Sequence, residues 1–262
     1  MLKECINLKQ LDLYIKEEKL KSLTFLSNCT QLSILLVECR SCKDITGLKD
    51  LIQLEFVTLK GTRKVKDLTS LARCTKLRKL TLECKIANLL PLYNCINLSN
   101  LKISHCNSIT GLDRFPNLAT LLLNKSTITN LNILQGCTNL KFLTLLDMYK
   151  LTSLSGVGFC INITNIYLEV CPFLKDISSL QKCTSLSTFY VRRSPFIDIN
   201  GLSKCKSLIS VKVSGILSKN YNFIQKLPFL DQLFVNGITV QYIDWRFNKK
   251  LEKYNHSEEE EN

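Results

Sequence analysis

The chain has 262 residues, of which 45% are hydrophobic and 22% are charged, and its net charge is +13. No apolar run approaches the ~18 residues that a membrane-spanning helix needs, so we expect no membrane span. The chain starts directly in a repeated pattern, without a leader peptide, and its 13 cysteines then indicate a reducing compartment. We therefore expect a cytoplasmic protein, with the nucleus as the second location.

The pattern Leu-x-x-Leu-x-Leu recurs about every 22 residues along almost the whole chain. Positions within a repeat are counted here from its first apolar residue, and the second and third apolar residues follow at +3 and +5. A fixed period of this length predicts a solenoid of stacked units. The first apolar residues, spaced 20 to 24 apart, are Leu8, Leu32, Leu54, Leu77, Leu98, Leu118, Leu140, Ile163, Leu186, Leu208 and Leu230.

Each repeat is predicted to begin with a short strand. In the ninth repeat, Phe189 and Val191 alternate with Tyr190 and Arg192. Because successive side chains of a strand point to opposite faces, the first two are expected to face the core and the other two the solvent.

A second apolar set closes each repeat, as in Leu174, Ile177 and Leu180. Their spacing of three favours a 3₁₀ turn or a short helix over a second strand. One unit cannot bury its own apolar face, so the units must stack. The predicted fold is an α/β repeat: a curved solenoid with a parallel concave sheet and short helical, 3₁₀ or irregular convex segments.

Two regions are predicted from the pattern. Residues 1–248 form the repeat domain of about eleven units, with a C-terminal cap at about 238–248 that contains Tyr242, Trp245 and Phe247. Residues 249–262 are a charged tail with nothing to bury, and we expect this tail to be disordered. The N-terminus shows no cap, so the partner of its open edge is either absent, giving a monomer, or a second copy, giving a dimer.

The chain resembles the leucine-rich repeat superfamily over roughly residues 2–245. Its period and phrases such as Asp44-Ile-Thr-Gly-Leu48 resemble the short-repeat class, which includes internalins and the leucine-rich-repeat regulatory subunit of protein phosphatase 1. The resemblance implies a curved surface that binds other macromolecules, in the role of a regulatory subunit or a substrate receptor.

The cysteines follow the repeat. Cys106 and Cys171 occupy position +8, and a further set lies three residues before the first leucine: Cys5, Cys29, Cys74, Cys95, Cys137, Cys160, Cys183 and Cys205. This placement is similar to the cysteine-containing repeats of F-box proteins. We expect small buried thiols. Disulfides, or a metal site that uses Cys84 and His105 at position +7 of adjacent repeats, are the alternatives, although only two or three of the four ligands can be named.

The concave face is predicted to carry the binding site, because positions +2, +4, +6 and +7 are expected to point outward. Exposed apolar and Tyr/Arg surface is typical of protein interfaces. A first patch comprises Ile34, Leu36 and Phe56. A second patch comprises Phe142, Leu146, Tyr167, Tyr190, Arg192, Arg193, Lys212 and Phe234. The alternative is that these aromatic residues only stiffen the sheet by cross-strand pairing.

The predicted function is therefore a non-catalytic scaffold for a partner protein, with no cofactor and no metal. Basic residues are dense in repeats two to four, so a nucleic-acid-associated module is an alternative. A third reading is an extracellular adhesion or recognition protein, in which glycan acceptor triplets would be used at Asn28, Asn97, Asn124, Asn162 and Asn255.

Overall fold

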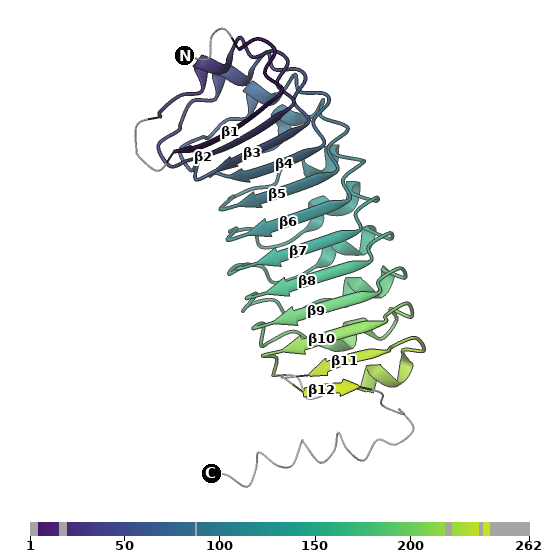
Figure 1. Cartoon of the computed structure of the whole chain (residues 1–262). Coiled ribbons are helices and arrows are strands. Elements are labelled where there is room, and N and C mark those ends of the chain that lie inside the picture. Colours follow the sequence, from purple (N-terminus) through teal and green to yellow (C-terminus); the bar gives the residue numbers. More distant parts are fainter. Residues whose placement is uncertain (1–4, 16–19, 87, 218–221, 236–237, 242–262) are drawn as a thin grey trace, which may run out of the picture.

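The computed structural model describes residues 5–15, 20–86, 88–217, 222–235 and 238–241, and these residues form one open, curved sheet (Figure 1). The strands follow one another in the sheet in the order of the sequence. They are β1 Gln10–Ile15, β2 Ile34–Cys39, β3 Phe56–Lys60, β4 Lys79–Glu83, β5 Asn100–Ser104, β6 Thr120–Asn124, β7 Phe142–Leu146, β8 Asn165–Glu169, β9 Thr188–Arg192, β10 Ser210–Ser214, β11 Gln232–Val235 and β12 Ile238–Gln241.

Strands β1 to β11 are parallel, and each begins two residues after the first apolar residue of its repeat. From β2 to β10 the inward residues are buried and the outward residues are half-buried or exposed, as in β9, where Phe189 and Val191 are buried between Thr188, Tyr190 and Arg192. The predicted alternation and the predicted solenoid are confirmed.

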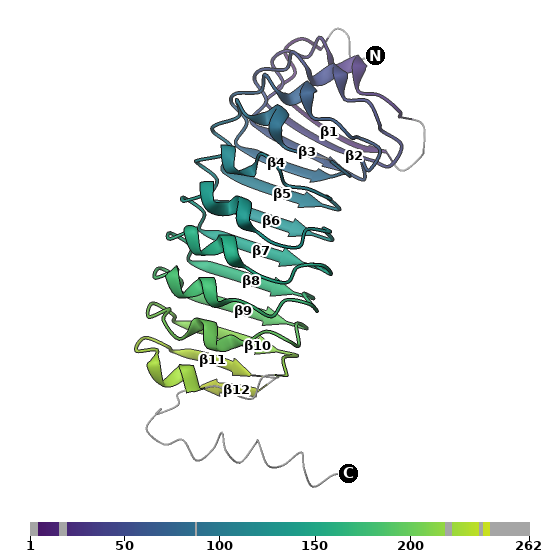
Figure 2. The same ribbon diagram turned by 180° about the vertical axis from the view of Figure 1, so that it is seen from behind.

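Short 3₁₀ helices close the repeats and lie behind the sheet (Figure 2). They are η1 Thr24–Leu26, η2 Thr46–Leu48, η3 Thr69–Leu71, η4 Leu90–Leu92, η5 Leu112–Arg114, η6 Asn132–Gly136, η7 Ser155–Phe159, η8 Ser178–Lys182, η9 Ile199–Leu202 and η10 Asn222–Lys226. Their starts are held by short polar side chains: Asp176 accepts a hydrogen bond from the Ser178 N–H at 2.9 Å. No helix among the described residues is long and apolar enough to cross a membrane.

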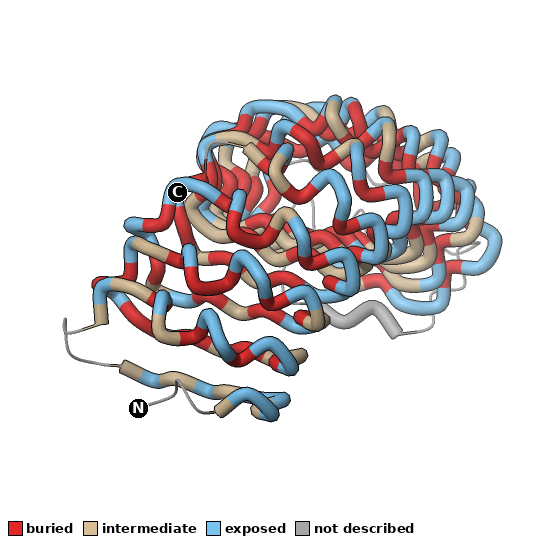
Figure 3. Tube along the Cα trace, turned by 90° about the horizontal axis from the view of Figure 1, so that it is seen from above, coloured by how far each residue is buried: buried red, intermediate tan, exposed pale blue. Residues whose placement is uncertain are grey.

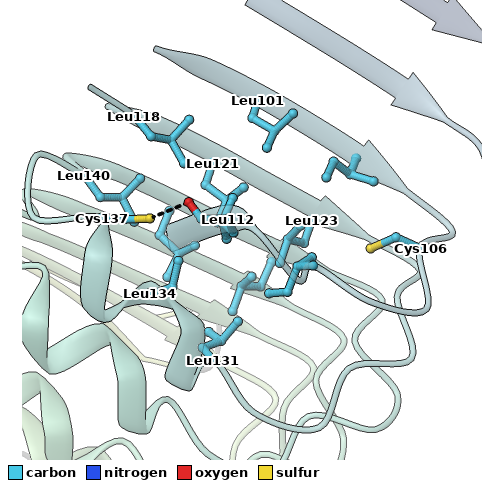
Figure 4. Packing of buried hydrophobic residues seen from close by; sticks show 14 of the residues in the cluster. Leu101, Cys106, Leu112, Leu118, Leu121, Leu123, Leu131, Leu134, Cys137 and Leu140 are labelled. Atoms are coloured by element: carbon cyan, nitrogen blue, oxygen red, sulfur yellow. Dashed lines mark hydrogen bonds between the residues drawn. The ribbon is translucent and has the colours of Figure 1, made fainter. Parts of the chain in front are cut away.

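The core is a continuous column of apolar side chains between the sheet and the 3₁₀ helices. From the second repeat on, the buried segments recur at the same place in successive turns of the tube (Figure 3). Figure 4 shows one section, in which the strand residues Leu121 and Leu123 pack toward Leu131 and Leu134 of the next convex segment. Each repeat buries its apolar face only against its neighbours, as a solenoid requires.

The cysteine column lies inside this core. Twelve of the thirteen cysteines are buried, and only Cys5 is partly accessible. The Cys137 Sγ lies 3.4 Å from the Leu112 carbonyl oxygen of the preceding repeat (Figure 4), and the Cys205 Sγ lies 3.1 Å from that of Leu180. A thiol suits this position because it is small and apolar, yet can also donate weakly to a carbonyl that already accepts a backbone N–H within its own 3₁₀ turn.

A column of asparagine side chains connects successive repeats at their surface. The Asn97 Nδ2 donates to the Thr75 carbonyl at 3.0 Å, and the Asn162 Nδ2 donates to the Thr138 carbonyl at 3.0 Å. Two of the triplets considered as glycan acceptors therefore use their amide nitrogen to join one repeat to the next.

Most strands are followed at +7 by a residue in the left-handed backbone region, which turns the chain sharply toward the convex side. Strain of about 1–2 kcal/mol attends this conformation in a non-glycine residue. The non-glycine examples are His105, Lys125, Asp147, Val170 and Arg193. Position +7 is thus the rim of the sheet and not a fourth concave column, which corrects the sequence-based expectation.

The two ends of the sheet differ. At the C-terminal end, β12 pairs with β11 in an antiparallel sense and so departs from the repeat. Residues 242–248 of the predicted cap and the predicted tail 249–262 lie outside the described residues. At the other end, β1 forms the edge of the sheet, and its inward residues Leu11, Leu13 and Ile15 are only partly buried. Pairing of a second copy with this edge stays a prediction.

Thiol reactivity should report the cysteine column. Burial raises the pKa of Cys74, Cys137 and Cys205 to about 12, and only thiolates react readily with disulfide reagents. At about pH 8 we expect Cys5 to react rapidly and the buried thiols to react only when guanidinium unfolds the protein, as measured with Ellman's reagent. Rapid labelling of several thiols in the native protein would contradict this burial.

Gly156 tests how closely the convex segments pack. A Cβ added at this residue would lie 1.8 Å from the Leu131 carbonyl oxygen of the preceding repeat. We expect Gly156→Ala to destabilise the protein by about 1–3 kcal/mol, as for other overpacked positions. Chemical denaturation measures this loss. The control Gln135→Ala, at an exposed residue of the neighbouring helix η6, should change the free energy of unfolding by less than about 0.5 kcal/mol. Equal effects of the two substitutions would show that the contact at Gly156 is not tight.

Candidate protein-binding face

The outward side chains of the sheet form straight columns, because the strands pair residue for residue without a shift. Tyr167 of β8 pairs directly with Tyr190 of β9, and Tyr190 pairs with Lys212 of β10. Lys212 pairs in turn with Phe234 of β11. Position +4 therefore presents these four side chains side by side.

Tyr167 and Tyr190 form the centre of the second predicted patch. Their rings are stacked, with centroids 4.3 Å apart and planes inclined by 3°. The separation is slightly less than the ~4.8 Å between neighbouring strands, so the parallel register itself produces the stack. Stacked aromatic pairs contribute about 0.5–1.5 kcal/mol beyond their buried area.

Charged neighbours fix this pair in place. The Tyr167 hydroxyl donates to the Glu169 carboxylate at 2.9 Å, and the Arg192 guanidinium lies 3.5 Å from the other oxygen of Glu169. Burial and the hydrogen bond to Glu169 raise the pKa of Tyr167 to about 12. Tyr167 is therefore a neutral donor near pH 7, and both rings keep one orientation before any partner arrives.

The remaining residues of the second patch surround the stack at different distances. Phe142 of β7 exposes 45% of its surface, whereas Leu146 is half-buried. Lys212 is exposed and Phe234 is half-buried. Arg193 does not join the concave columns: it lies on the rim, where its backbone is left-handed.

The first predicted patch is smaller. Ile34 of β2 pairs with Phe56 of β3, and Glu38 pairs with Lys60 at the end of the same strands. Phe56 is 39% exposed, but Ile34 and Leu36 are half-buried within the sheet. The structure thus places these three side chains together, with one aromatic ring available to solvent.

Sequence reasoning missed a row of exposed aromatic residues on the rim beside the second patch. Tyr149, Phe173 and Phe196 follow β7, β8 and β9 at positions +9 and +10, and each is more than half exposed. The signal was available, since the corresponding residues Lys64, Ser108 and Ile128 of earlier repeats are polar or buried. Aromatic surface is therefore concentrated over repeats seven to nine on two adjoining faces.

The alternative of a metal site that uses Cys84 and His105 finds no support among the described residues. Cys84 is buried directly after β4, and its pKa is raised to about 12 by burial and then by the neighbouring thiol of Cys106. Repeat four lacks the left-handed residue that follows most strands, so Cys84 occupies the buried position that Cys106 fills one repeat later. His105 lies on the rim and is half-buried. Across the described residues, no three His, Cys, Asp or Glu side chains form a group that could hold a metal.

Several basic residues of repeats two to four are paired with residues of the preceding repeat. The Arg73 guanidinium lies 2.5 Å from the Asp50 carboxylate, and that of Arg78 lies 3.7 Å from Glu55. These pairs lie on the loops before the strands. They interrupt the continuous positive surface that a nucleic-acid backbone would need.

No family model and no curated protein matches this sequence. Known structures do match it. An internalin, InlF, from Listeria monocytogenes is similar over 82% of this chain, with 23% identity and a TM-score of 0.71, and this chain spans 64% of that protein.

Two further structures are similar. The functional domain of InlJ from Listeria monocytogenes, which includes a cysteine ladder, matches 90% of this chain and 59% of its own, with 16% identity and a TM-score of 0.55. The ectodomain of the Arabidopsis thaliana receptor kinase GASSHO1/SCHENGEN3, in complex with CASPARIAN STRIP INTEGRITY FACTOR 2, matches 88% of this chain and 30% of its own, with 17% identity and a TM-score of 0.59. The chain therefore has the leucine-rich-repeat fold that its sequence predicts.

Proposed function

We propose that this protein is a non-catalytic scaffold that binds a segment of a partner protein on its concave face, over repeats seven to eleven. The stacked pair of Tyr167 and Tyr190, held by Glu169 and Arg192, carries the proposal. The short-repeat class suggests that such binding serves a regulatory subunit or a substrate receptor. The buried reduced cysteines support a cytoplasmic location.

The physical basis is preorganisation. A partner that binds flexible side chains must order them, at about 0.5–1.5 kcal/mol for each side chain immobilised. Here the sheet register and the ring stack order both tyrosines, and the hydrogen bond to Glu169 holds Tyr167. Their rings, together with exposed Phe142, offer apolar area with a polar edge, and residues of this kind dominate the energy of protein interfaces.

Replacement of Tyr167, Tyr190 and Phe234 should weaken binding of the partner protein. We expect the variant Tyr167→Ala/Tyr190→Ala/Phe234→Ala to lose at least about tenfold in affinity, since hot-spot residues contribute about 2 kcal/mol or more each. Affinity capture from native lysate with quantitative mass spectrometry compares this variant with the wild type at matched expression. Thermal unfolding confirms that both remain folded.

The matched control removes exposed aromatic residues outside the concave face. Tyr93→Ala/Phe159→Ala deletes two rings that are 60% and 50% exposed near the convex helices η4 and η7. This control should retain the partner. If the concave variant and the control retain the same proteins, or if the retained material is nuclease-sensitive ribonucleoprotein, the concave-face proposal fails.

A further inference from the structure

Three residues from successive repeats meet at the rim of the sheet near its N-terminal end. The Arg63 guanidinium lies 3.0 Å from the Glu83 carboxylate, and one of its nitrogens lies 3.0 Å from the His105 Nε2. The same carboxylate accepts a hydrogen bond from the Gly61 N–H at 3.0 Å. We call the group of Arg63, Glu83 and His105 the rim triad.

The contact between Arg63 and His105 defines the state of the imidazole. A guanidinium can only donate, so the His105 Nε2 accepts and the ring is neutral. Burial, and then the charge of Arg63, lower the pKa of His105, while Glu83 acts in the opposite direction. The His105 ring is therefore neutral, and it would gain a proton if a second negative charge came close.

The surroundings of the rim triad are strongly positive. Lys85 and Lys125 also act on His105 and lower its pKa. Both are exposed, as is Lys60 at the end of β3. Glu38 of β2 lies beside Lys60, and Glu83 pairs with Arg63, so Lys85 and Lys125 leave the site with more positive than negative groups, and it attracts anions.

We propose that the rim triad, with Lys85 and Lys125, binds the phosphoryl group of a phosphorylated serine or threonine in a protein segment. A phosphoryl group carries a charge of about −1.5 to −2 and three strong acceptor oxygens. Because Nε and Nη2 of Arg63 already contact Glu83 and His105, Arg63 would supply its Nη1 donors, the two lysines would supply point charges, and His105 would add a donor once protonated. A single carboxylate has too little charge to balance this many cations.

The geometry favours a phosphorylated protein over a nucleic acid. At the opposite edge of the strands, Arg73 and Arg78 are paired with Asp50 and Glu55, which reduces the positive charge available there. A nucleic-acid backbone needs a track of phosphate contacts, whereas one phosphoryl group needs a single cluster. The rim triad borders the concave face, so a segment lying along that face would reach it. This inference extends the proposed function to a second position, and it does not depend on the tyrosine pair.

The test is a titration followed by NMR of the His105 ring. The chain has two histidines, so the spectrum of His105→Gln assigns the His105 signals. The probes are a phosphoserine tripeptide amide, its unphosphorylated form and inorganic phosphate. We expect the phosphoserine peptide to shift the His105 signals in a saturable manner and to bind no more weakly than inorganic phosphate. Binding of inorganic phosphate alone, or no shift with either anion, overturns the proposal.

Variants at the rim triad distinguish specific binding of the phosphoserine peptide from attraction by the net positive charge of the protein. Arg63→Ala should weaken the phosphoserine peptide about tenfold, which corresponds to one charge-assisted contact. Glu83→Gln, which removes the competing carboxylate, should tighten it. The matched control Arg78→Ala removes one arginine on the opposite side of the strands and should leave the affinity unchanged. If Arg63→Ala and Arg78→Ala lose the same affinity for the phosphoserine peptide, the binding depends only on the net charge of the protein, and the proposal is overturned.

The pH dependence provides an independent readout. Binding of a dianion raises the pKa of His105, so the complex takes up a proton and the affinity should rise as the pH falls from about 8 to about 6.5. Below about 6 the phosphoryl group itself gains a proton and the affinity should fall. His105→Gln should flatten the rise, and a rise that persists in this variant contradicts the role of His105.

Two further experiments distinguish phosphopeptide binding from nucleic-acid binding, and the rim triad from the concave face. If a single-stranded oligonucleotide displaces the peptide and binds more tightly with increasing length, the site is for nucleic acid and the proposal fails. The variant Tyr167→Ala/Tyr190→Ala/Phe234→Ala should bind the phosphoserine peptide as the wild type does. Failure of the concave-face proposal is therefore distinguishable from failure of this one.

Discussion

The stacking of one repeat on the next is the interaction on which the rest of this structure depends. A single repeat has one strand and one 3₁₀ helix, and neither buries its apolar face alone. The parallel strands pair residue for residue, so each position of the repeat lies beside the same position of its neighbours. The core leucines, the thiols and the surface asparagines all follow from this single constraint.

The same constraint organises the surface. When two successive repeats carry an aromatic residue at +4, the rings must stack, as Tyr167 and Tyr190 do. When a rim residue of one repeat is basic and that of the next is acidic, they must meet, as Arg63 and Glu83 do. The two candidate binding sites are thus a column of side chains on the sheet and a cluster at its rim, and both arise from small variations between successive repeats.

Much of the fold could be predicted from the sequence, because a period near 22 with apolar residues at 0, +3 and +5 leaves few alternatives. The strands, the 3₁₀ helices and the burial of the cysteines are confirmed. The burial of the side chains at the rim, at position +7, could not be predicted from the spacing of the repeats alone. Whether a repeat includes a left-handed residue after its strand decides which side chain is buried, and the fourth repeat, which lacks one, buries Cys84 for this reason.

The candidate site was predicted in part. The positions of Tyr167, Tyr190 and Phe142 follow from alternation, and the structure brings the two tyrosines together. Their hydrogen-bonded support by Glu169 and Arg192, and the contact of Arg63 with His105 across two repeats, depend on side-chain reach that a linear pattern does not encode. The predicted cap residues Tyr242, Trp245 and Phe247 lie outside the described residues and stay predictions.

We expect a partner protein to lie directly on the tyrosine column. Site-specific photo-crosslinking can detect such a contact, with the photoreactive residue p-benzoylphenylalanine in place of Tyr190 or, for comparison, of convex Phe159. We expect a discrete crosslinked protein at position 190, lost when Tyr167 is also replaced by alanine, and none at position 159. Crosslinking only at the convex position, or to nucleic acid at position 190, would contradict it.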